Sequence, residues 1–127
     1  MKLRIEKEVS IASAFTHLIA AWDVGPYSWY RTVEYTIAGD MAVNPGKEPP
    51  GPGSLLAIVT MDDPDEDAPI TVRVDGRWIE QALNRCVALG GAPARDAMRI
   101  IDEDPSADQN TADLVMQVGA YGSVVFG

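Results

Sequence analysis

Ten residues near the middle of the chain, 44–53, read NPGKEPPGPG and contain four prolines and three glycines. Proline lacks the backbone N–H that helices and sheet ladders use, and glycine is costly to order, so this stretch opposes both structures. The flanking segments are strand-like and similar in composition, which makes it a long connection inside one domain. We therefore expect residues 1–127 to form a single domain that contains this 44–53 loop.

The part of the chain before this loop contains two predicted strands and one predicted helix. Residues 2–9 alternate between apolar and charged side chains, the period of a strand with one face in water. Ser10 is suited to cap a helix over 11–23, where apolar residues recur at helical spacing until a Gly-Pro pair. Aromatic and β-branched residues over 28–37 predict the second strand.

Beyond the loop, a continuous apolar run over 55–61 and an alternating segment over 70–74 predict a β-hairpin. Asp75 then caps a helix with a broad apolar stripe, which a Gly-Gly pair ends. A shorter helix follows over 93–101, and either Asp108 or Asn110 caps a last helix. The order β-α-β-β-β-α-α-α predicts an α+β fold, in which a mainly antiparallel sheet of about four strands carries helices on one face.

The charge of the chain is strongly unbalanced, because 19 acidic side chains oppose 10 basic ones and give a net charge of −9. This excess argues against direct binding of nucleic acid or an anionic membrane. Nine acids lie in two short segments, and the other ten equal the bases in number. We expect these two acidic segments either to dock on a basic partner or to serve only as solvated turns. Their residues are Asp62, Asp63, Asp65, Glu66, Asp67, Asp102, Glu103, Asp104 and Asp108.

Residue types that carry catalysis or bind metals are scarce. The one histidine, His17, could reach the one cysteine, Cys86, but Cys86 belongs to an apolar helix stripe, where a buried thiol is usually inert. Zinc sites need several Cys or His, and the acids over 62–67 lack the spacing of a calcium loop. We expect no cofactor, no metal and no enzyme activity. With a single thiol and no export signal, we expect a cytoplasmic protein.

Three aromatic rings and an arginine occur within five residues: Tyr27, Trp29, Tyr30 and Arg31. This set could stack on a planar ligand or form an interface hot spot, and packing in the core is the other interpretation. Strand alternation predicts Trp29 and Arg31 on one face and Tyr30 on the other, unless a bulge intervenes.

Near its start the chain has a YxWY segment after a glycine, and it ends with DxNTADLVMQVGAYGSVVFG. In these two features it resembles a group of short accessory proteins of tailed bacteriophages and prophages. The resemblance implies a phage protein, in a group mostly of unknown function where proteins of this size often act in host takeover or against host defence. The matching C-terminal positions are Asp108, Thr111, Ala112, Asp113, Gln117, Tyr121, Gly122, Phe126 and Gly127.

Together these observations favour a non-enzymatic phage protein that inhibits a host factor in the cytoplasm of the infected bacterium. An anti-CRISPR-like or other anti-defence inhibitor would act through the acidic segments on a host protein with a basic surface. The alternative is a sponge for a nucleotide signal that uses the aromatic and arginine segment. A second alternative is a small enzyme. Pairing into a homodimer fits either of the first two hypotheses.

Overall fold

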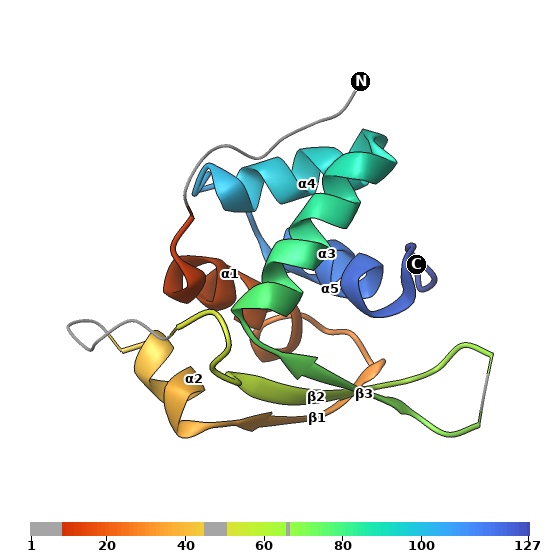
Figure 1. Ribbon diagram of the computed structural model, residues 1–127. Helices are drawn as coiled ribbons and strands as arrows, with labels where there is room; N and C mark the ends of the chain where they lie inside the picture. The colour runs from red at the N-terminus through yellow and green to blue at the C-terminus, as the bar shows by residue number, and fades with distance from the viewer. Residues whose placement is uncertain (1–8, 45–50, 66) are drawn as a thin grey trace.

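The computed structural model describes residues 9–44, 51–65 and 67–127. Four longer helices stand on one side of a small sheet, and a short helix lies beside the end of the first strand (Figure 1). In chain order the elements are α1 (Ile11–Asp23), β1 (Tyr30–Tyr35), α2 (Ile37–Ala42), β2 (Ala57–Met61), β3 (Ile70–Val74), α3 (Gly76–Leu89), α4 (Gly91–Ile101) and α5 (Gln109–Tyr121).

The sheet is antiparallel, with strand order β1-β2-β3. Side chains alternate along β2, so that Ala57, Val59 and Met61 are buried on the face that the helices cover. The opposite face carries mainly polar side chains: Thr32 and Glu34 of β1, Ile58 and Thr60 of β2, and Thr71 and Arg73 of β3. No helix in Figure 1 covers this outer face.

Helix α5 lies at the centre of the helical layer and packs against α1, α3 and α4. Gly119 permits the close approach of α3, because a Cβ there would lie only 2.6 Å from the ring of Trp78 and 2.8 Å from the Cβ of Ala82. The core lies between the sheet and the helices, and both supply its largest fully buried apolar side chains. These are Phe15, Leu18, Leu56, Val59, Met61, Val74, Ile100, Ile101, Val115, Met116 and Val118.

The α+β prediction is confirmed, but the predicted sheet of about four strands is too large. The described residues form a three-stranded sheet. The strand predicted over 2–9 lies outside the described residues except for Val9, which directly precedes Ser10 and α1. The hairpin of β2 and β3 is confirmed. Most of the predicted loop 44–53 is also outside the described residues.

The strand predicted over 28–37 is wrong at its C-terminal end, where α2 begins instead. The Thr36 side chain caps this helix by accepting from the Gly39 N–H at 3.0 Å, and its hydroxyl lies 3.1 Å from the Leu56 carbonyl oxygen. Gly39 is needed here, since a Cβ would overlap that same oxygen. The turn into α2 therefore depends on the backbone next to β2, which sits about 20 residues further on.

The predicted N-terminal caps of three other helices are confirmed. The side chains of Ser10, Asp75 and Asp108 cap α1, α3 and α5 by accepting backbone N–H groups of the first turns. Gly90 ends α3 with φ at 74°, a left-handed conformation that glycine adopts without strain. Helix α4 begins at Gly91, two residues earlier than expected. No helix among the described residues is long and apolar enough to span a membrane.

Candidate functional site

The aromatic segment after α1 folds back onto α5 around a buried carboxylate. Asp113 is only 7% exposed. Its Oδ1 accepts hydrogen bonds from Trp29 Nε1 at 2.7 Å and from the Tyr30 hydroxyl at 2.6 Å. Its Oδ2 accepts from Gln117 Nε2 at 2.8 Å. Burying a carboxylate without hydrogen-bond partners costs free energy, and here three donors replace the water that Asp113 loses.

The proton of the Tyr30 hydroxyl is held firmly in this arrangement. Burial raises the pKa of Tyr30 far above its ordinary value of 10.0, and the nearby negative charge of Asp113 raises it further. Tyr30 therefore stays protonated and remains a hydrogen-bond donor at neutral pH and in mildly alkaline solution. This is the behaviour of a structural group rather than of a proton-transfer catalyst, whose pKa would lie near the working pH.

Gln117, one helical turn after Asp113, fixes the C-terminal segment. Its Oε1 accepts from the backbone N–H of Val125 at 2.9 Å and of Phe126 at 2.8 Å, and its Nε2 lies 3.1 Å from the Phe126 carbonyl oxygen. The Phe126 ring then stacks on Trp29, with centroids 5.1 Å apart and planes 7° apart. We call Trp29, Tyr30, Asp113, Gln117 and Phe126 the Asp113 cluster.

The Trp29 indole has a second ring stacked on it. Tyr27 lies with its centroid 4.8 Å away and its plane inclined by 25°, and its hydroxyl donates to Asn110 Oδ1. A planar ligand would need a free aromatic face, and two such contacts are already made within the chain. The structure thus brings Tyr27, Trp29 and Tyr30 together, and it does so by packing them on one another.

A β-bulge corrects the predicted alternation. Tyr30 pairs with Met61 and Thr32 pairs with Thr60, so that Arg31 is the extra residue. Tyr30 consequently lies on the helix-covered side, together with Trp29, and not on the opposite face as predicted. Arg31 separates from both rings, is exposed, and makes an ion pair with Asp62 through Nε.

The first acidic segment forms the connection between β2 and β3, which projects past the helical layer in Figure 1. Asp65 and Asp67 are exposed, and Glu66 lies outside the described residues. Asp63 accepts from the Asp65 N–H at 2.9 Å, which shapes the turn. Asp62 is held at the base, where its backbone carbonyl accepts from the Tyr121 hydroxyl.

The second acidic segment is used mainly for local structure. Asp108 caps α5 through the N–H groups of Asn110 and Thr111. Asp104 accepts from the Ser106 N–H at 2.8 Å, and this bond lowers the pKa of the Asp104 carboxyl below 3.8. Glu103 accepts from the Ser13 hydroxyl of α1. Asp104 and Asp108 thus complete a turn and a helix end, and Glu103 joins this segment to α1.

The structure does not bring the two acidic segments together. Asp108 precedes the first residue of α5, whereas Asp62 contacts Tyr121, the last residue of the same helix. The 13 residues of α5 span about 20 Å at about 1.5 Å per residue. Figure 1 likewise shows the two segments at opposite ends of the molecule. The two segments therefore form two separate acidic surfaces.

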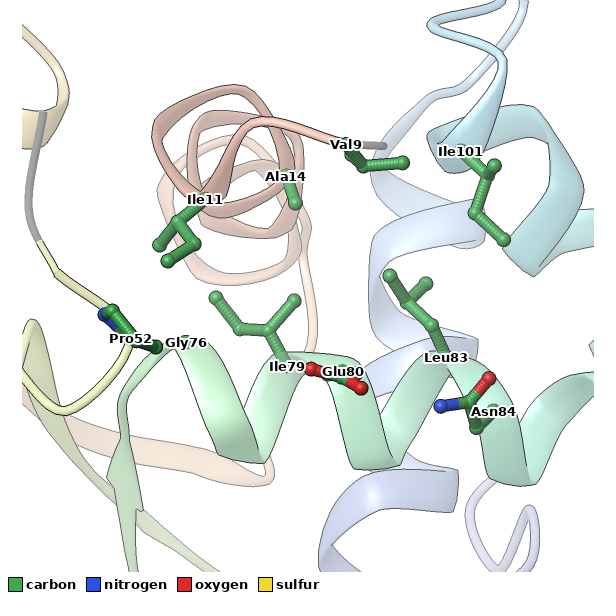
Figure 2. Close-up of a pocket in the computed structure, with 10 residues that line it drawn as sticks. All are labelled: Val9, Ile11, Ala14, Pro52, Gly76, Ile79, Glu80, Leu83, Asn84 and Ile101. Carbon is green, nitrogen blue, oxygen red and sulfur yellow. The ribbon is translucent and has the colours of Figure 1, made fainter. Parts of the chain in front are cut away.

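A pocket of about 220 Å³ lies apart from all these residues, between α1, α3 and the end of α4 (Figure 2). Most of its lining residues are apolar, but polar atoms make up about half of its wall, and the polar groups of Glu80 and Asn84 stand at one side. Neither the Asp113 cluster nor either acidic segment contributes to it. The full lining is Val9, Ile11, Ala14, Pro52, Gly76, Ile79, Glu80, Leu83, Asn84 and Ile101.

Cys86 is fully buried in α3, as its place in the apolar stripe predicts. Burial raises the pKa of its thiol from 9.0 to about 12, so the reactive thiolate is scarce near neutral pH. Among the described residues, no group of three His, Cys, Asp or Glu side chains could hold a metal ion.

Asp113 and Gln117 enter the sequence-based prediction only as positions of the C-terminal motif and are not predicted as members of a site. A usable signal exists: both are polar, they stand four residues apart, and they interrupt the apolar part of the helix that follows Thr111. Their partners cannot be predicted in this way, because Trp29 and Tyr30 lie more than 80 residues earlier.

Comparison with models of known protein families, with curated proteins and with solved structures finds no match. The resemblance to phage accessory proteins therefore stays a prediction from the terminal motifs. Any function must be argued from the arrangement of this chain's own residues.

Proposed function

We propose that the protein is a non-enzymatic binding protein whose acidic β2–β3 connection docks on a basic surface of another protein. The observation that supports this most directly is the projection of residues 62–65 and 67–69 beyond the helical layer (Figure 1). A projecting segment can enter a concave or grooved partner without a clash from the body of the protein. Complementary charge then speeds and orients the encounter.

The base of this connection is anchored, which lowers the cost of presenting the carboxylates. Asp62 is tied by three groups: its N–H donates to the Trp29 carbonyl at 2.9 Å, its carbonyl accepts from Tyr121, and its carboxylate pairs with Arg31. Preorganised groups lose less entropy on binding than mobile ones. The exposed carboxylates of Asp65 and Asp67 are then the ones that a partner would meet.

The phage resemblance makes the partner a host protein, and the chain would act as an inhibitor by covering that protein's basic, nucleic-acid-binding surface. The second acidic segment has a smaller part in this proposal, since its carboxylates complete local structure at the other end of α5. No observation favours the nucleotide sponge to the same degree, because Trp29 is already stacked on Tyr27 and Phe126.

The proposal is tested by capture from bacterial lysate with immobilised protein at low and high salt. The triple variant Asp63→Asn, Asp65→Asn, Asp67→Asn removes three charges from the connection. A matched control, Asp23→Asn, Asp40→Asn, Glu80→Gln, removes three exposed charges elsewhere. We expect the native chain and the control to retain the same basic protein at low salt, and the triple variant to lose it. Equal retention by all three chains would contradict the proposal.

A further inference from the structure

Strand β1 is an edge of the sheet, and no described element pairs with its outer side (Figure 1). The Thr36 N–H donates to the Leu56 carbonyl. Because backbone groups alternate in direction along a strand, Thr36, Glu34 and Thr32 direct theirs toward β2. Val33 and Tyr35 therefore direct their N–H and C=O groups away from the sheet. They form an open ladder on which another strand can add.

We propose that this edge pairs with β1 of a second copy, antiparallel about a two-fold axis that places Val33 opposite Val33. The two three-stranded sheets would then join into one sheet of six strands. A two-fold contact of this kind is isologous, so each group that one copy offers is met by the complementary group of the other.

The charges along β1 select this alignment. With Val33 opposite Val33, Glu34 of each copy lies opposite Thr32 of the other. The bulge places Arg31 next to Thr32, so Arg31 of the second copy lies diagonally across from Glu34, within reach of a long side chain. Arg31 donates to Asp62 only through Nε, and in the described part of the chain its other nitrogens have no acceptor. Glu34 is exposed and forms no ion pair with the described residues.

Alignments shifted toward the C-terminal end of β1 are unfavourable. Placing Val33 opposite Tyr35 would set Glu34 directly opposite Glu34, and like charges in that position destabilise a strand pair. Placing Tyr35 opposite Tyr35 leaves little strand to pair, because α2 begins at Ile37. Charged residues on an edge usually discourage association, but here opposite charges meet across the axis.

Large apolar side chains stand exposed where β1 ends. Tyr35 is 41% exposed, Ile37 80% and Met41 36%. A neighbouring chain would remove part of this surface from water, which adds a favourable hydrophobic contribution to the hydrogen bonds and ion pairs. The dimer would also carry its two acidic connections at opposite ends. This inference goes beyond the proposed function and does not depend on it.

The association is tested by sedimentation of the whole chain over a range of concentrations. We expect a mass twice the 13.7 kDa of one chain. Glu34→Arg and Arg31→Glu should each give monomers, because each variant places like charges beside one another across the axis. An equimolar mixture of the two variants should recover the dimer, since the opposite charges then meet again.

Two further variants make the result specific. Glu80→Arg makes the same charge change on α3 and should leave the dimer intact. Glu34→Gln removes attraction without adding repulsion and should weaken association about fivefold to tenfold, since two symmetry-related pairs are lost. A monomeric native chain, a dimer that Glu34→Arg leaves unchanged, or a mixture that stays monomeric would each overturn the proposal.

Discussion

Trp29 and Asp113, 84 residues apart in the chain, are joined by a hydrogen bond of 2.7 Å from the indole Nε1 to the carboxylate Oδ1. The bond connects the segment that leads into β1 with the central helix α5. Because Tyr30 and Gln117 donate to the same carboxylate, Asp113 holds the sheet, the helical layer and the C-terminal segment together.

Replacing Asp113 should therefore cost more stability than any surface acid. In Asp113→Asn, one acceptor oxygen becomes a donor that faces existing donors, and we expect the free energy of unfolding to fall by about 2–3 kcal/mol. Urea unfolding measures the change. Asp23→Asn, at an exposed site, should change it by less than about 0.5 kcal/mol. Similar values for the two variants would show that the carboxylate is not a structural centre.

Gln117→Ala should release the C-terminal segment while the rest of the protein remains folded. The amides of Val125 and Phe126 lose their acceptor in this variant, so their hydrogen exchange should approach that of an open segment. Trp29 fluorescence should change as well, because Phe126 stacks on the indole. Gln81→Ala, at an exposed position on α3, is the control. Protection of both amides in Gln117→Ala would contradict this role.

Stability should fall in alkaline solution. Burial raises the pKa of Tyr121 from 10.0 to about 12, with further contributions from Asp62 and Asp63. The folded state therefore keeps a proton that the unfolded state loses above pH 10. The stabilisation that this proton gives the folded state is fully present below pH 10 and is lost as the pH rises toward 12. Urea midpoints measured from pH 9 upward should decline. Tyr121→Phe should make that decline shallower without removing it, because the pKa of Tyr30 is also raised and Tyr30 contributes to the same decline. An equally steep decline in the variant would rule out Tyr121 as a source.

Cys86 should resist alkylation in the folded protein. Its side chain is fully buried and the pKa of its thiol is about 12, so both access and thiolate are lacking at pH 8. Iodoacetamide labelling followed by mass spectrometry should show modification only after denaturant is added. Rapid labelling of the folded chain would mean that α3 opens readily.

Local patterns predict most elements of this fold because caps and periodicity act between near neighbours. Ser10, Asp75 and Asp108 each cap a helix through N–H groups two or three residues away, and the apolar stripe of α3 identifies its buried face. Where Thr36 turns the chain into α2, the deciding contact is the Leu56 backbone, and nothing in the local pattern predicts that contact.

The candidate site is harder to predict for the same reason. Alternation places Tyr30 on the wrong face, because the bulge at Arg31 arises only when β1 pairs with β2. The aromatic rings near Tyr27 are recognisable as a group, yet their stacking partner Phe126 is almost 100 residues further along the chain. Long-range contacts of this kind decide whether an aromatic surface is free or occupied.

The most direct test of the central proposal, docking through the acidic β2–β3 connection, is the salt dependence of affinity for the captured basic partner. We predict that affinity falls steeply with salt for the native chain and that the slope is clearly shallower when Asp63, Asp65 and Asp67 are neutralised. The control neutralised at Asp23, Asp40 and Glu80 should keep nearly the native slope. The same steep slope for the native chain and for the variant neutralised in the connection would contradict the proposal.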